Sequence, residues 1–252
     1  MATEIATPRK PAARLQWMTA TVREVIDETP RVRTLVLDVP LWPGHKAGQH
    51  VDVRLTAGDG YQAQRSYSIA SAPGAPLMLT VEMLPDGEVS SYLAGEARKG
   101  DTFELRGPIG GYFVWTEALD GPLFLVGGGS GIVPLMAMLR QRAAVKAAQP
   151  ARLLLSSRSF ADIIYRDELE RLAGQGLDII HTLTRDKPAG WNGQTRRIDR
   201  AMLAEVGFDP AQHPRIFICG PTPLVEAAAR DLRDLGHAAR LIKTERFGPT
   251  GK

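Results

Sequence analysis

Apolar and polar residues alternate with a period of two over most of the chain before residue 106. The alternation is clearest at residues 32–39, 51–55 and 77–83. Short runs of this kind, separated by glycine and proline, are typical of an antiparallel β-barrel or sandwich. Residues 89–97 interrupt the pattern, and their spacing predicts a short helix.

After Pro122 the pattern changes to buried strands that alternate with amphipathic helices. We expect strands at residues 123–126, 153–155, 177–183, 216–218 and 241–245, with helices between them at 132–139, 162–172, 198–206 and 224–235. This alternation predicts a doubly wound α/β domain. Its parallel sheet is covered by helices on both faces and binds ligands at the carboxyl ends of its strands.

The length of 252 residues fits two domains of ordinary size. We divide the chain into a disordered leader at 1–14, a barrel domain at 15–117 and an α/β domain at 118–252, with the glycine-rich segment 107–121 as a linker. No apolar run approaches the roughly 20 residues that cross a bilayer. The leader also lacks the apolar stretch of a secretory signal. We therefore expect a cytoplasmic protein that has no membrane partner.

Cysteine is the most restrictive component of the composition, because Cys219 is the only one. A single thiol cannot form an internal disulfide, a cysteine-rich metal site or the four-thiolate cradle of an iron–sulfur cluster. A redox cofactor would therefore be organic or external. The net charge of +3 is spread along the chain without a basic run, so we rank nucleic-acid binding low.

The segment Arg65-Ser66-Tyr67-Ser68 ends one of the predicted strands. In a strand, Arg65 and Tyr67 point one way and Ser66 and Ser68 the other. A guanidinium can hold a phosphate and a phenol ring can stack on a heterocycle, which suits a flat, phosphorylated cofactor. Taken alone, four such residues are more often part of an ordinary surface strand.

Two glycine-containing turns are candidate anion sites. Gly87 precedes a short helix in which Ser90 is a suitable N-cap, and a helix start presents free backbone N–H groups. Residues 127–131 (Gly-Gly-Gly-Ser-Gly) join a buried strand to a helix, where the backbone can approach a pyrophosphate closely. This turn is not the G-x-G-x-x-G fingerprint, but it holds more glycine than packing requires.

Two further segments lie at predicted carboxyl ends of the parallel strands. Cys219-Gly220-Pro221 places its thiol at the ligand edge of the sheet, although a lone buried cysteine is more often inert. Ser157 and Arg158 follow another strand, and Tyr165 and Arg166 enter the next helix. Such a cluster favours an adenosine 2′-phosphate and therefore NADPH, with NADH left open and a surface ion pair of Arg158 as the alternative.

The order of these segments resembles the ferredoxin–NADP reductase superfamily over nearly the whole chain. The matching residues are 65–68, 87–93, 107–110, 128–134, 219–221 and the closing Glu245-Arg246-Phe247-Gly248. The resemblance implies an FAD-binding barrel and an NADP-binding domain, with hydride passing between the two cofactors where the domains meet. Many relatives that serve oxygenases carry a fused iron–sulfur domain with four cysteines, whereas this chain has a single cysteine. We therefore expect this protein to deliver electrons to a separate ferredoxin or a small acceptor.

The resemblance also implies roles for individual residues. Arg65 and Ser90 would hold the FAD pyrophosphate, Tyr67 would flank the isoalloxazine, and Ser68 would bond near N5. Cys219 and Glu245 would line the nicotinamide pocket, and Phe247 would cover the flavin face. The remaining expected contacts are Ser66, Val81, Gly87 and Val89 for FAD, and Gly129, Ser130, Ser157, Arg158, Arg166, Gly220 and Pro221 for NADP.

Three other functions stay open at this point. A flavin reductase or diaphorase that acts on free flavin or quinone would need the same hydride chemistry. A flavin-free dehydrogenase would leave the barrel unexplained. A basic nucleic-acid-binding protein is the lowest-ranked alternative.

Overall fold

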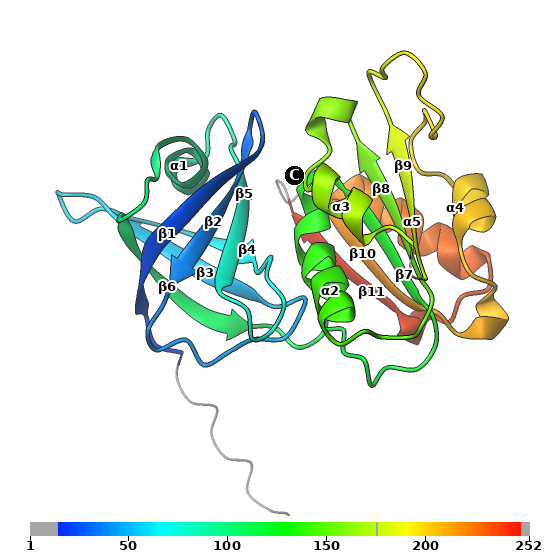
Figure 1. The fold of residues 1–252 in the computed structure, drawn as a ribbon, viewed down its shortest axis with the longest axis horizontal. Coiled ribbons are helices and arrows are strands. Elements are labelled where there is room, and N and C mark those ends of the chain that lie inside the picture. Colours follow the sequence, from blue (N-terminus) through cyan, green and yellow to red (C-terminus); the bar gives the residue numbers. More distant parts are fainter. Residues whose placement is uncertain (1–14, 175, 248–252) are drawn as a thin grey trace, which may run out of the picture.

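The computed structural model describes residues 15–174 and 176–247, so the expected leader lies outside the described residues. A six-stranded antiparallel sheet and a five-stranded parallel sheet stand side by side (Figure 1). This arrangement confirms the predicted two-domain fold. No helix in the described part of the chain is long and apolar enough to cross a membrane.

The first sheet has the order β4-β3-β6-β1-β2-β5. Between β5 and β6 the chain forms the short helix α1 (Glu88–Ser91) and a π-helical turn at Tyr92–Glu96. An isolated bridge between Ile69 and Leu79 links the chain after β4 to β5, the opposite edge of the sheet. The strands are β1 (Met18–Thr29), β2 (Val32–Asp38), β3 (His50–Thr56), β4 (Gln62–Ser68), β5 (Leu77–Glu82) and β6 (Thr102–Ile109).

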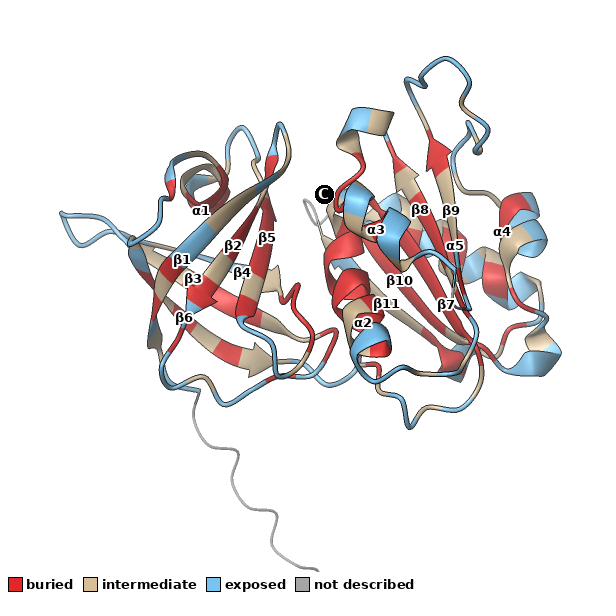
Figure 2. Ribbon diagram, in the orientation of Figure 1, coloured by how far each residue is buried: buried red, intermediate tan, exposed pale blue. Residues whose placement is uncertain are grey.

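The second sheet has the order β11-β10-β7-β8-β9 and is parallel throughout. Its strands are β7 (Leu123–Gly128), β8 (Ala151–Ser157), β9 (Leu177–Leu183), β10 (Arg215–Pro221) and β11 (Ile242–Phe247). Helices α2 (Ile132–Ala144) and α3 (Arg166–Leu172) pack on one face, and α4 (Arg200–Val206) and α5 (Thr222–Asp234) pack on the other. All six residues of β7 are buried, as expected of a central strand covered on both faces (Figure 2).

Strand β5 shows how the period of two builds the contact between the domains. Leu77, Leu79 and Val81 belong to the barrel core. On the other face of the strand, Met78 packs on the core of the α/β domain, and Thr80 and Glu82 bond to residues of that domain. One face of β5 therefore packs in the barrel core, and the other face contacts the α/β domain.

Two expectations about local structure are wrong. Residues 107–121 are not a linker, because β6 continues through Ile109 and the side chains of Phe113 and Trp115 are each only 2% exposed. Phe113 packs edge-on against Phe217 of β10, with ring centroids 5.3 Å apart. The helix expected at 162–172 is also interrupted: a 3₁₀ turn ends at Asp162, and α3 starts only after Tyr165.

Candidate functional site

On the barrel side, Arg65 and Tyr67 lie on β4, which is an edge strand next to α1. Arg65 is exposed, and its Nη1 donates to the carbonyl of Gln64 at 2.7 Å. Among the described residues no carboxylate pairs with this guanidinium. Tyr67 is half-buried against the barrel core, and this burial raises the pKa of its phenol. An unpaired cation beside a neutral ring fits a phosphorylated aromatic cofactor.

The two serines of this segment have different surroundings. Ser66 donates to Asp52 at 2.6 Å, and Asp52 is also paired with Arg106 at 2.9 Å. The Ser66 hydroxyl is therefore held on the opposite strand face from Arg65, so an FAD contact from Ser66 would be limited to its backbone. Ser68 is half-buried at the end of β4, and its hydroxyl has no partner among the described residues.

The turn before α1 differs from the expected capping arrangement. The N-cap is Gly87, while the Ser90 hydroxyl donates to the Gly87 carbonyl at 3.2 Å and accepts from the Leu84 amide at 3.3 Å. A Cβ on Gly87 would lie 2.1 Å from that hydroxyl, which explains the glycine. Ser90 is 5% exposed and its hydroxyl is bonded within the turn. An anion at this turn would therefore bind backbone N–H groups and not the Ser90 hydroxyl.

Val81 and Val89 are each 1% exposed and belong to the barrel core. Their side chains therefore cannot lie against a flavin outside that core. The expected FAD contacts of these two residues would be limited to the backbone.

The glycine turn of the α/β domain joins β7 to α2. Packing explains more of its glycines than the sequence suggested: a Cβ on Gly131 would lie 2.1 Å from the Cys219 carbonyl oxygen, and one on Gly128 would lie 2.7 Å from Leu224. Gly129 differs, because it is exposed, has φ +55° and has open space where a Cβ would be. Ser130 donates to Glu82 of β5 at 2.9 Å, so the turn is bonded directly to the barrel.

Cys219 and Glu245 are register neighbours on β10 and β11, and Cys219 is also paired with Gly127 on β7. Cys219 is 2% exposed, and burial together with the nearby Glu245 charge raises the pKa of its thiol. Burial also raises the pKa of Glu245 to about 7. The structure thus brings together a neutral thiol and a carboxyl group that can be protonated near neutral pH. Gly220 and Pro221 follow Cys219 at the same edge of the sheet.

At the carboxyl end of β8, Arg158 is exposed and Ser157 is 5% exposed. The structure adds Arg185, which the sequence analysis missed: its amide donates to the Arg158 carbonyl at 2.9 Å, and its side chain is exposed. Only the register of β8 with β9, in which Ser157 pairs with Leu183, could have revealed this proximity. Arg166 pairs with Asp167 at 3.3 Å and lies over Phe160.

The structure excludes Tyr165 from the expected 2′-phosphate cluster. Its side chain is 3% exposed, and its hydroxyl donates to Thr80 of the barrel at 2.5 Å. Tyr165 therefore belongs to the contact between the domains.

Phe247 ends β11 opposite Pro221 and packs, half-buried, against the core of the α/β domain. Whether it covers a flavin stays a prediction. Gly248, the last residue of the closing motif, lies outside the described residues.

Family models match both halves of the chain. The oxidoreductase FAD-binding domain matches residues 20–114, and the oxidoreductase NAD-binding domain matches residues 125–230. Together these matches cover most of each sheet. They support FAD and a nicotinamide as the two cofactors.

Among similar proteins are the glycine betaine monooxygenase reductase subunit of Pseudomonas aeruginosa, 34% identical, and NADH-cytochrome b5 reductase 1 of Aspergillus terreus, 31% identical. The first alignment covers 90% of this chain and 63% of the relative, and the second covers 77% and 68%. The chain thus spans somewhat less than two thirds of the length of the Pseudomonas protein.

Two solved structures are similar to almost the whole chain. The cytochrome P450 reductase of Amycolatopsis has a TM-score of 0.80 at 28% identity and covers 94% of this chain and 71% of its own. A ferredoxin NADP⁺ reductase from Neisseria gonorrhoeae with bound FAD and NADP has a TM-score of 0.79 at 25% identity and covers 91% and 98%. With the sheet topology and the two family matches, these similarities show that the chain belongs to the ferredoxin–NADP reductase superfamily of FAD-dependent NAD(P)H oxidoreductases.

Proposed function

We propose that the protein transfers a hydride from NADPH to bound FAD and then passes single electrons to a separate acceptor protein, such as a ferredoxin that serves an oxygenase. The observation that carries the proposal is the bond from Ser130 of the glycine turn to Glu82 of the barrel, because it joins the turn to the domain that holds the unpaired Arg65. Bound flavin supplies the chemistry, since it accepts hydride and releases electrons singly.

The residues of the chain bind, orient and shield the two cofactors. Arg65 supplies charge-assisted hydrogen bonds to the FAD pyrophosphate, and the ring of Tyr67 lies along the flavin. The Ser68 hydroxyl is available for a hydrogen bond at the ring edge. Cys219 is buried and Glu245 is half-buried, which limits water at the nicotinamide pocket, and a protonated Glu245 adds no negative charge to it.

A separate acceptor is supported by the cysteine content and by the relatives. A single cysteine in 252 residues cannot ligate an iron–sulfur cluster. Two similar proteins are reductases of a monooxygenase and of a cytochrome P450. The alternative is a flavin reductase or diaphorase, which would give its electrons to free flavin or quinone.

Anaerobic reduction of the purified protein tests this function. NADPH should bleach the flavin absorbance within the time of a turnover, and a plant-type [2Fe–2S] ferredoxin should then reoxidise the flavin faster than an equal concentration of free FMN or a quinone does. Faster reoxidation by free flavin or quinone would establish the alternative. A colourless protein that takes up no added FAD would reject both the proposed function and the flavin reductase alternative.

The preference for NADPH rests on Arg158 and Arg185. Their backbones are hydrogen-bonded to each other at the ligand edge of the sheet, and both side chains are exposed. No ion pair within 4.0 Å involves either guanidinium among the described residues. Two such cations suit an adenosine 2′-phosphate, which binds arginine through charge-assisted hydrogen bonds.

The ratio of kcat/KM for NADPH to that for NADH measures this preference. Each of R158A and R185A should lower the ratio by about tenfold or more, because one charge-assisted bond contributes roughly 1.5 to 3 kcal/mol. R166A is the matched comparison, since Arg166 is already paired with Asp167, and it should have the smaller effect. An unchanged ratio in both R158A and R185A would reject the assignment.

A further inference from the structure

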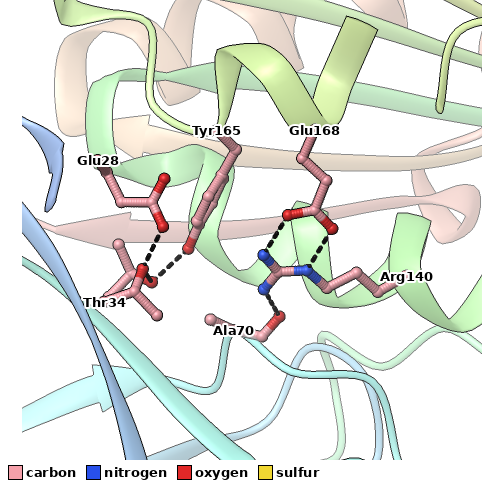
Figure 3. Close-up of polar contacts among 7 residues, drawn as sticks. Glu28, Thr34, Ala70, Arg140, Tyr165 and Glu168 are labelled. Carbon is pink, nitrogen blue, oxygen red and sulfur yellow. Dashed lines mark hydrogen bonds and ion pairs between the residues drawn. The ribbon is translucent and has the colours of Figure 1, made fainter. Parts of the chain in front are cut away.

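A chain of hydrogen bonds through three hydroxyl groups connects the two domains (Figure 3). Tyr165 donates to Thr80 at 2.5 Å, Thr80 and Thr34 are 2.7 Å apart, and Thr34 donates to a carboxylate oxygen of Glu28 at 2.6 Å. Tyr165 precedes α3 in the α/β domain, whereas the other three residues lie on β5, β2 and β1 of the barrel. The barrel thus supplies three of the four groups in the chain.

The direction of this chain follows from the number of protons. Each hydroxyl has one proton to donate. Because Tyr165 donates to Thr80 and Thr34 donates to Glu28, Thr80 has to donate to Thr34. All three bonds therefore run from the α/β domain toward the Glu28 carboxylate. Removing one hydroxyl takes one hydrogen bond from a buried neighbour, since Thr34 is fully buried and Thr80 is 5% exposed.

Arg140 of α2 strengthens the same contact. Its guanidinium makes a two-bond pair with Glu168 of α3, at 2.9 and 2.6 Å, and donates to the Ala70 carbonyl of the barrel at 2.7 Å. It also lies 4.8 Å from the centre of the Tyr165 ring. Tyr165 is therefore held by two contacts: the Arg140 guanidinium lies over its ring, and Thr80 of the barrel accepts a hydrogen bond from its hydroxyl.

The position of these bonds on β5 connects them to the cofactor site. Thr80 and Glu82 lie two residues apart on the outward face of this strand, and Thr80 bonds Tyr165 while Glu82 bonds Ser130 of the glycine turn. Residues i and i+2 of a strand are separated by roughly 6.6 Å. A rotation of the α/β domain on the barrel would stretch the Tyr165 bond and shift the glycine turn together.

We propose that Tyr165 is a positioning residue for hydride transfer, because its bond to Thr80 fixes the orientation in which the glycine turn presents nicotinamide to the flavin. This inference rests on the proposed function. Hydride transfer depends steeply on the distance between the reacting atoms, and a misplacement of about 1 Å can slow a reaction roughly 100-fold. A bond between domains that lies away from the reacting atoms can therefore control the rate without touching either cofactor.

The first test is the rate of flavin reduction by saturating NADPH in holoprotein carrying Tyr165→Phe. The rate should fall about fivefold or more, the effect of roughly 1 kcal/mol, while the affinity for NADP⁺ changes less than about twofold. Thr182→Val is the control, because it removes a buried hydroxyl that donates to the Arg196 carbonyl within the α/β domain. It should leave the reduction rate unchanged.

Four further measurements separate positioning from general stabilisation. Thr80→Val should slow flavin reduction as much as Tyr165→Phe does. The double variant, Tyr165→Phe with Thr80→Val, should be little slower than either single variant. Thr80→Ser keeps the hydroxyl and should reduce the flavin at the rate of the unsubstituted protein. Thr80→Val also serves if Tyr165→Phe does not fold. Amide exchange in oxidised holoprotein without nicotinamide should accelerate at residues 77–82 and 165–172 in Tyr165→Phe.

An unchanged reduction rate in Tyr165→Phe, or effects of the two substitutions that multiply in the double variant, would overturn the inference. A melting temperature that falls without a change in rate would show a purely structural bond. Failure of the proposed function itself gives a different result, because then NADPH would not reduce the flavin of the unsubstituted protein.

Discussion

The two halves of the candidate site are built in different ways. On the barrel side, the key groups are side chains of an edge strand, with Arg65 exposed and Ser68 half-buried. On the other side, the glycine turn and Cys219 are held by close packing, so that Gly131 lies against the carbonyl of Cys219. The barrel half therefore depends on a ligand to complete it, whereas the other half is formed by the fold itself. Substitutions should accordingly affect binding on the first side and stability on the second.

The sharpest test of this difference is Gly131→Ala. The new Cβ would overlap the Cys219 carbonyl at 2.1 Å, and neither backbone segment can move freely. We expect the free energy of unfolding to fall by at least the roughly 3 kcal/mol at the upper end of overpacking costs. Gly129→Ala is the matched control, because open space surrounds it and only its φ of +55° is unfavourable, at about 1 to 2 kcal/mol. Equal losses in urea denaturation would contradict a turn formed by packing.

Arg65→Ala tests the barrel side. Since the guanidinium is exposed and pairs with no described carboxylate, the unfolding free energy of the apoprotein should change little. Affinity for FAD should weaken by about tenfold or more, the effect of losing one charge-assisted bond. Fluorescence titration of apoprotein measures the affinity, and Arg23→Ala, an exposed arginine elsewhere on the barrel, should match the unsubstituted protein. A melting temperature that falls without weaker FAD binding would place Arg65 among the structural residues.

Burial on the nicotinamide side predicts a pH dependence. The folded pKa of Glu245 is about 7 and lies above its ordinary value of 4.5. The folded state therefore binds the proton more tightly than the unfolded state, and the stability from this group is fully present below pH 4.5 and lost as pH rises to about 7.

We expect the loss to be about 1 to 2 kcal/mol, since one pKa unit corresponds to about 1.4 kcal/mol and solvent screens a partly exposed group. Glu245→Gln should remove this part of the pH dependence in denaturant titrations of the apoprotein. A variant whose stability keeps the full slope between pH 5 and 7 would show that Glu245 does not titrate there.

The smallest effect is expected for Cys219→Ser. Burial raises the pKa of the thiol, so little of it is the reactive thiolate, and hydride transfer needs no covalent intermediate. Flavin reduction should slow by no more than about tenfold, and the chain mass should stay unmodified during turnover. An inactive variant that still binds both cofactors, or a trapped cysteine adduct, would require a covalent step.

The sequence predicted the elements better than it predicted contacts between them. Alternation along residues 51–55 and 77–83 and the repeat after Pro122 were sufficient for the fold, because each strand carries its own pattern of burial. The glycine and proline density of residues 107–121 was misleading, because Phe113 and Trp115 fill space that the other domain leaves. A local pattern contains no information about such a neighbour.

The candidate site shows the same limit. The structure brings Cys219 next to Glu245, as the motifs implied. Tyr165 was assigned to a phosphate because it enters the helix that follows Ser157 and Arg158, yet the fold buries it against Thr80. Arg185 was missed because its proximity to Arg158 depends on the register of β8 with β9, which is a tertiary property.

The core of the α/β domain also has a consequence for folding. Val32, Ala47 and Ala70 of the barrel belong to the same buried cluster as Leu125 and Leu135 of the other domain. Melting either half alone would expose this shared cluster to water, so the two halves stabilise each other. We therefore expect the chain to unfold in one cooperative step, with a calorimetric enthalpy equal to the van't Hoff enthalpy. A barrel expressed alone should melt at a lower temperature than the whole chain.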